Sequence, residues 1–277
     1  MSRDITRVKH VIVAPLDWGL GHATRCIPVI RYLIDQGCKV NIGTSGDALK
    51  LLKAEFPDQK CFELPSYRAT YSRWVPLMLM VFAQVPRFLW VIGKERREIK
   101  KIALRTSADL IISDNRYGCR VAGIRSVFIG HQINIIMPRG LAWLGSIVNF
   151  FNHSFISRFD DCWIPDDPKN SLSGKLSKPI FGRTKWIGLL SRFEKSATLP
   201  TEYDLGVVLS GPEPQRTILE DLVLAQLIET DLRVIVVRGL VDATQLPDIN
   251  NNVRVVNHLH SKELQNIIER SKVILSR

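Results

Sequence analysis

The stretch VIVAPLDWGLGHATRCIPVIRYL, residues 11–33, decides the fold of this chain. It opens with an apolar run, passes through a turn that holds Gly19 and Gly21, and continues as an amphipathic segment from Ala23 to Leu33. This order predicts the first strand, turn and helix of a parallel α/β sheet. Glycines let the backbone approach a ligand closely, and free amides at a helix start face it. His22 adds a proton acceptor near neutral pH to the same turn.

The two glycines do not follow the dinucleotide-binding pattern. That pattern requires a third glycine at position 24, where this chain has Thr24. It also requires an acidic residue after the second strand to hold a ribose, and the strand predicted over 39–44 ends without one. The spacing therefore disfavours NAD binding.

The Gly21-His22 pair, with Pro28 and the helical segment 29–33 after it, resembles the start of a GT-B glycosyltransferase. The resemblance is to the lipid-acceptor family that includes the peptidoglycan N-acetylglucosaminyltransferase, and to the UDP-sugar glycosyltransferases of small molecules. It implies an α/β chain with two Rossmann-like domains, each built on a parallel sheet.

The segment 186–191, WIGLLS, resembles the crossing between the two domains of such enzymes. We therefore expect an acceptor-binding domain over 1–188 and a nucleotide-sugar-binding domain over 189–277. The helix whose acidic residue holds the nucleotide ribose in the family has no counterpart before Arg277. The resemblance thus implies that the second domain is incomplete, that the 277-residue form is truncated, and that this form is inactive and binds UDP-sugars weakly.

Composition indicates a globular chain with room for two domains, since 45% of its 277 residues are hydrophobic and 23% are charged. The N-terminus lacks an apolar signal region, which favours a cytoplasmic location. Five cysteines without a CxxC pair indicate reduced thiols and neither a disulfide frame nor a zinc site. We expect no cofactor and no metal.

The positive charge lies in the first part of the chain. Residues 1–190 hold 28 Lys and Arg against 15 Asp and Glu, whereas residues 191–277 hold 10 against 12. Such a surface attracts nucleic acid, anionic lipid or a phosphorylated acceptor. Nucleic acid is disfavoured because no aromatic and basic motif of a known RNA or single-strand module is present.

Two apolar runs favour a membrane surface as the partner. Residues 74–93 carry one charge, Arg87, and have basic residues on both sides, while residues 133–156 are rich in aromatic side chains. The first run is long enough to span a bilayer, but Pro76, Pro86 and Arg87 interrupt it, so a helix lying in the interface fits better. Ordinary burial of both runs against the sheet is an equally open alternative.

Polar residues follow two further predicted strands. The strand over 108–113 ends at Asp114 and Asn115, and the strand over 126–130 ends at His131. Carboxyl ends of parallel strands meet at one ligand-binding edge, so these residues become neighbours of His22. The alternative is that Asp114 caps a following helix and His131 is a hydrogen-bonded loop residue.

The segment His131-Gln132-x-Asn134 resembles the His-Glu-Gln-Asn segment of the peptidoglycan enzyme, with the glutamate absent. The resemblance implies acceptor-binding roles for a set of residues on the first domain. They are Gly19, Gly21, Asn115, His131, Gln132 and Asn134.

The donor loop is predicted between a strand over 203–209 and a helix over 217–228. In the resembling family this loop lies against the donor diphosphate. Free amides at a helix start and the cation of Arg216 suit an anion, although Ser-Gly-Pro is also a common turn. The implied donor-binding residues are Ser210, Gly211, Gln215 and Arg216. His258 and His260 have no evident third ligand, so a metal site there is disfavoured.

The resemblance implies transfer of a hexose or N-acetylhexosamine from a nucleotide diphosphate sugar, UDP-linked, to a hydroxyl of a lipid-linked or amphipathic acceptor. His22 would be the general base and Asp114 its orienting partner, within hydrogen-bond reach or one water apart. Helix amides and Arg216 would stabilise the leaving diphosphate without a metal. The alternatives are a nucleotide-sugar epimerase of the same fold and a non-catalytic protein that binds membrane surfaces.

Overall fold

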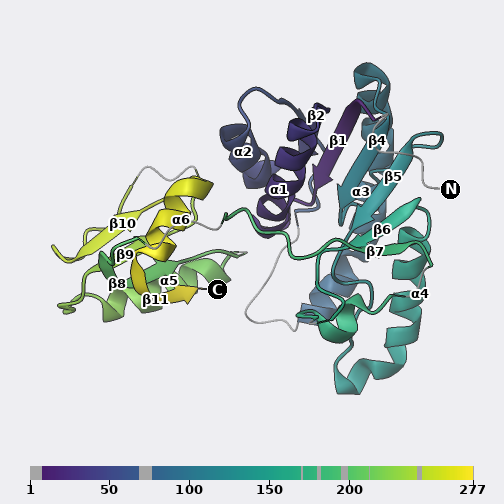
Figure 1. The fold of residues 1–277 in the computed structure, drawn as a ribbon. Coiled ribbons are helices and arrows are strands. Elements are labelled where there is room, and N and C mark those ends of the chain that lie inside the picture. The colour runs from purple at the N-terminus through teal and green to yellow at the C-terminus, as the bar shows by residue number, and fades with distance from the viewer. Residues whose placement is uncertain are drawn as a thin grey trace.

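The chain folds around two parallel sheets, which stand side by side in Figure 1. The computed structural model describes residues 8–68, 77–169, 171–179, 182–194, 199–211, 213–241 and 245–276. Within these residues the first sheet has seven strands in the order β3-β2-β1-β4-β5-β6-β7. They are β1 (His10–Pro15), β2 (Lys39–Thr44), β3 (Lys60–Glu63), β4 (Leu110–Asp114), β5 (Arg125–Ile129), β6 (Asp161–Ile164) and β7 (Thr184–Trp186).

Helices cover both faces of the first sheet. They are α1 (Gly21–Asp35), α2 (Gly46–Glu55), α3 (Leu77–Thr106) and α4 (Gly145–Ile156), with short 3-10 turns η2 (Arg139–Leu144) and η3 (Gly174–Ser177). Side chains alternate along β1: Val11 and Val13 pack under α1 and α2, whereas Ile12 packs under α3. Figure 1 shows α1 and α2 on the side of the sheet that faces the second domain.

The second sheet has the order β10-β9-β8-β11 and its pairs are also parallel. Its elements are β8 (Tyr203–Val208), α5 (Gln215–Gln226), β9 (Val234–Val237), β10 (Val253–Val256), α6 (Ser261–Glu269) and β11 (Ser271–Ser276). Val207 and Val236 form its core together with Leu219 and Val223 of α5. This arrangement confirms the predicted α/β class with a parallel sheet in each half.

Polar contacts join the halves near α2. The Oγ of Ser261, at the start of α6, donates to Oε2 of Glu55 at 3.1 Å. A guanidinium nitrogen of Arg31 donates to the backbone carbonyl of Arg192 at 3.3 Å, and Arg31 also forms an ion pair with Glu55. Glu55 is therefore a shared partner of both domains.

The first apolar run lies mainly in one long helix. Residues 74–76 lie outside the described residues, and α3 continues through Pro86 to Thr106. Val91 is buried beside Leu16, whereas Trp90 is 65% exposed. The run is thus neither wholly buried nor wholly exposed, and its predicted contact with a membrane stays a prediction. No helix among the described residues is long and apolar enough to cross a bilayer.

Candidate active site

The structure brings His22 and Asp114 together, as the sequence predicts. Asp114 is the last residue of β4, in register with Pro15 at the end of β1, and His22 is the second residue of the helix that follows β1. The Nδ1 of His22 lies 3.0 Å from Oδ1 of Asp114. The stretch between β4 and β5 is described throughout and holds no helix, so the alternative that Asp114 caps a helix is wrong.

Sequence reasoning missed Arg25, which lies at the centre of this cluster. Its Nε donates to Oδ2 of Asp114 at 2.9 Å, and one terminal nitrogen donates to Oδ1 of the same carboxylate. The other terminal nitrogen lies 2.7 Å from Nδ1 of His131. The available signal was its spacing, since residues three apart on a helix share a face and Arg25 follows His22 by three.

The charges of His22 and Arg25 keep the Asp114 carboxylate ionised. Burial by itself would raise its pKa, but the charges and hydrogen bonds of His22 and Arg25 hold the pKa at about 2. The ionised carboxylate can only accept hydrogen bonds, so Nδ1 of His22 donates to it and Nε2 is left as the basic nitrogen. The terminal nitrogen of Arg25 that lies 3.0 Å from the same Nδ1 is then a close neighbour without a bond.

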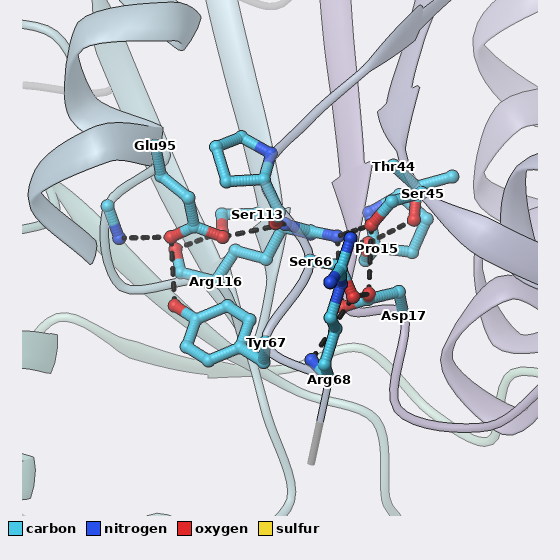
Figure 2. A network of polar contacts seen from close by, with 12 residues as sticks. Pro15, Asp17, Thr44, Ser45, Ser66, Tyr67, Arg68, Glu95, Ser113 and Arg116 are labelled. Atoms are coloured by element: carbon cyan, nitrogen blue, oxygen red, sulfur yellow. Dashed lines mark hydrogen bonds and ion pairs between the residues drawn. The ribbon is translucent and has the colours of Figure 1, made fainter. Parts of the chain in front are cut away.

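A second buried network holds the loop between β1 and α1. Figure 2 shows Arg116 reaching from the turn after β4 toward Glu95 on one side and Asp17 on the other. Its nitrogens donate to Oε1 of Glu95 at 2.7 Å, to Oδ1 of Asp17 at 3.2 Å and to the carbonyl of Pro15 at 2.8 Å. Asp17 also accepts from Ser45 at 2.9 Å.

Glu95 closes this network on its far side. The Tyr67 hydroxyl donates to Oε2 of Glu95 at 2.8 Å, and the amide of Gly118 donates to the same oxygen at 3.2 Å. Burial raises the pKa of Glu95, and the Arg116 charge opposes this. The network therefore ties α3 to the glycine turn through the fully buried pair of Arg116 and Glu95, which the sequence did not predict.

The predicted acceptor-binding residues lie in two places, one at the carboxyl edge of the first sheet and the other beside α4. Gly19, with φ +77°, lines the cleft between the domains, Gly21 begins α1, and Asn115 has φ +56° directly after β4. Asn134 lies apart: its Nδ2 donates to the carbonyl of Lys178 at 2.9 Å.

The cavity that Asn134 lines belongs to α4. It has a volume of about 610 Å³, and Asn149, Phe150 and His153 also line it. Gln132 is exposed near the start of this segment. The structure thus brings His131 to the His22 cluster, and it places Asn134 at a separate cavity.

The donor loop faces the glycine turn across a cleft of about 470 Å³. The first domain supplies Asp17, Trp18 and Gly19 to its lining, and the second supplies Ser210 and Gly211. Pro212 lies outside the described residues. A neighbouring cavity of about 450 Å³ is lined by Gly21, Arg25 and Ser210 among others. The ends of the first sheet and the loop after β8 therefore meet at one place.

Arg216 is less available than the sequence suggests. Its Nε donates to Glu213 at 2.6 Å, one terminal nitrogen forms an ion pair with Glu220, and the other donates to the hydroxyl of Thr217 at 2.7 Å. Glu213 itself lines the cleft. Gln215 begins α5, so its backbone amide stands at the positive end of that helix.

His258 and His260 lie in the loop before α6, with ring centroids 6.0 Å apart. Among the described residues, no group of three or more His, Cys, Asp or Glu side chains is placed to hold a metal ion. Desolvation lowers the pKa of His258, and the nearby His260 and Arg192 lower it further.

No protein-family model matches this sequence, and no curated protein matches it. Solved structures match in fold. SnogD, a glycosyltransferase from Streptomyces nogalater, is 14% identical, with a TM-score of 0.59 over 98% of this chain and 76% of that one. The spinosyn rhamnosyltransferase SpnG, complexed with thymidine diphosphate, is 13% identical, with a TM-score of 0.58 over 97% and 75%. MurG of Acinetobacter baumannii is 12% identical, with a TM-score of 0.47 over 97% and 71%.

The first two likenesses establish the architecture. SnogD and SpnG are glycosyltransferases, and this chain shares with them the GT-B arrangement of two Rossmann-like domains. The expected fold class is confirmed. The chain spans about three quarters of the length of these two neighbours.

Proposed function

We propose that this chain is a metal-independent glycosyltransferase that moves a hexose or N-acetylhexosamine from a nucleotide diphosphate sugar, UDP-linked, to an acceptor hydroxyl. One observation carries the proposal: His22 and Asp114 form a hydrogen-bonded pair at the carboxyl edge of the first sheet, and Gly21 and Arg25 of the same helix as His22 line one cavity together with Ser210 of the second domain. Glycosyl transfer requires a base for the acceptor hydroxyl and a binding site for the leaving diphosphate.

The reaction uses the His22 base of the first domain and the loop after β8 of the second domain. Nε2 of His22 takes the proton of the acceptor hydroxyl, and Asp114 stabilises the imidazolium that forms. The hydroxyl oxygen bonds to the anomeric carbon while the bond from that carbon to the diphosphate oxygen breaks. The leaving nucleoside diphosphate carries the negative charge to the Ser210 and Gly211 backbone and to the amide of Gln215. We assign Arg216 a smaller share, because Glu213 and Glu220 already neutralise it.

The nucleotide assignment has support from a neighbour in fold. The SpnG structure is of a complex with thymidine diphosphate. The loop after β8 leads into the start of α5, where the backbone amides of Gln215 and Arg216 stand at the positive end of the helix, while the amide of Thr217 donates to Glu213. We therefore propose a nucleoside diphosphate as the leaving group.

We further propose a lipid-linked or amphipathic acceptor, reached at the cytoplasmic surface of a membrane. The first domain combines its positive charge with exposed aromatic side chains on η2 and α4, where Trp143 is 70% and Phe150 69% exposed. Apolar side chains beside cations bind anionic lipid surfaces. In this view the cavity lined by Asn134 and His153 is next to Phe150 and takes part of the acceptor.

A transfer assay tests the function, and it also tests the expectation that the 277-residue form is inactive. The protein is incubated with a panel of UDP- and TDP-sugars and with alkyl glycosides or polyprenyl-linked sugars, with EDTA present, and products are read by mass spectrometry. His22→Ala should lower kcat by about 10² to 10⁴, the usual contribution of a positioned acid-base group. Asp114→Asn should lower it in the same direction, because the amide cannot stabilise the imidazolium.

The matched control is His10→Gln. His10 begins β1 at the opposite end of the strand, where its Nδ1 contacts the carbonyl of Thr106 at 2.8 Å. It should leave turnover unchanged. Equal turnover in the wild type and in His22→Ala would show that His22 is not the general base. A free sugar epimer as the product would favour the epimerase alternative.

A further inference from the structure

One guanidinium lies between two imidazoles in the candidate active site and donates to one of them. The two terminal nitrogens of Arg25 lie 3.0 Å from Nδ1 of His22 and 2.7 Å from Nδ1 of His131. Both rings therefore turn the same atom toward Arg25, although 109 positions separate them in the sequence. The Asp114 carboxylate holds the guanidinium in place through both of its oxygens.

The contact with Arg25 decides where the proton of His131 resides. A guanidinium has donors and no acceptor, so Nδ1 of His131 accepts from Arg25 and the proton of the neutral ring is on Nε2. Charges from three elements face this ring: Arg25 and His22 on α1, Asp114 on β4, and Asp166 after β6. Desolvation, Arg25 and His22 lower the pKa of His131, while Asp114 and Asp166 oppose them.

We propose, on the basis of the glycosyltransferase function above, that Arg25 is a positioning residue that keeps His131 neutral with its proton on Nε2. The site then carries a hydrogen-bond donor beside the His22 base. The acceptor it takes has a second oxygen next to the hydroxyl that reacts, as a sugar or another vicinal diol has.

The chemistry of the pair supports this acceptor class. Nε2 of His22 accepts from the hydroxyl that reacts, and Nε2 of His131 donates to a neighbouring oxygen that does not react. An imidazolium at His131 would donate through both nitrogens and would repel Arg25. The contact with Arg25 therefore gives the two histidines different roles although they carry the same side chain.

Nuclear magnetic resonance of the histidine side chains in the folded protein tests the state of His131. Its nitrogen shifts should report an Nε2–H tautomer in the wild type. In Arg25→Gln the pKa of His131 should rise by about one unit, because a like charge has been removed and the Asp114 charge is uncovered. The tautomer preference should be lost as well.

Two further variants keep the test decisive. Arg25→Lys retains the charge but not the planar fork, so its tautomer preference should also weaken even if Arg25→Gln fails to fold. Arg31→Gln removes a cation six residues further along the same helix, where its partner is Glu55, and should leave His131 unchanged. An Nδ1–H tautomer in the wild type, or an unchanged His131 in folded Arg25 variants, overturns the proposal.

Acceptor analogues test the substrate class separately. The wild type should prefer dodecyl glucoside over analogues that lack the hydroxyl next to the reacting one by about tenfold in kcat/KM. His131→Ala should lose this preference, and His131→Gln, which retains an N–H donor, should recover part of it. If His131→Ala keeps the same preference for dodecyl glucoside as the wild type, the substrate assignment is overturned. Absence of transfer with every acceptor overturns the proposed function for this 277-residue form and agrees with its expected inactivity, while the resonance result still decides the role of Arg25.

Discussion

Arg116 shows how a single buried cation can hold a functional loop. Its guanidinium is fully buried and touches Glu95, Asp17, Ser45 and the backbone before the glycine turn, as Figure 2 shows. A buried carboxylate that loses its partner keeps the cost of its desolvation. The position of Asp17 at the cleft therefore depends on a residue that does not itself reach the cleft.

Arg116→Met should destabilise the protein by about 3 to 5 kcal/mol, because it leaves the buried Glu95 unpaired. Adding Glu95→Gln should recover part of this loss by removing the uncompensated charge. Urea unfolding at pH 7 measures both. Arg125→Met is the control, since its ion pair with Asp161 is partly exposed and should cost about 1 kcal/mol or less. If Arg116→Met lowered the free energy of unfolding by less than Arg125→Met does, the stabilising role of the Arg116 network would be contradicted.

At the scale of elements, α3 divides into two faces with different surroundings. Val91 and Glu95 are buried against the first domain, while Leu89 and Trp90 are exposed and Lys94 stands 5.3 Å over the Trp90 ring. Burial is therefore established for one face only. The exposed face combines apolar side chains with cations, which fits a lipid surface.

Leu89→Ser with Trp90→Ser should weaken binding to vesicles that contain phosphatidylglycerol by about tenfold or more, since each lost apolar side chain is worth about 1.5 kcal/mol or more when buried. Flotation with phosphatidylglycerol and with pure phosphatidylcholine vesicles measures this. Leu104→Ser is the matched control: it is 68% exposed on the same helix, about 21 Å further along the axis. If all variants float with the vesicles to the same extent as the wild type, the exposed face of α3 does not bind lipid.

At the scale of the whole molecule, Glu55 connects the two domains. It lies at the end of α2, forms an ion pair with Arg31 of α1 and accepts from Ser261 of α6. Leu51 of α2 and Leu264 of α6 line one cavity between the domains. A carboxylate with partners on both sides contributes to that geometry directly.

Glu55→Ala should loosen the docking of α6 and leave both sheets intact. Amide hydrogen exchange in the first turn of α6 should accelerate by about threefold to tenfold, the effect of about 1 kcal/mol, while exchange in β1 and β8 is unchanged. Glu98→Ala, which removes only a contact with Lys101 within α3, is the control. Unchanged exchange at α6 would show that Glu55 does not hold the domains.

The sequence by itself determined the elements and the edge at which the site lies. Apolar runs mark β1, β4 and β8, and because strands of a parallel sheet end at one edge, the residue pattern alone places His22 and Asp114 together. The sequence did not predict the short strands β3 and β7, because a strand of three or four residues with polar positions has too little periodicity to be recognised.

Only the tertiary structure decided which charges meet. Arg25 reaches Asp114 across 89 positions and His131 across 106, and Arg116 reaches Asp17 across 99. Strand register and helix rotation set those contacts, and neither leaves a local signal in the sequence. Arg216 differs, because its partners Glu213 and Glu220 stand three and four positions away, and that spacing is already visible in the sequence. The further ion pair of Glu220 with Arg238 depends on how α5 packs on its sheet. Local patterns fix elements because they depend on neighbouring residues, whereas charge pairs between elements depend on the packed distances between those elements.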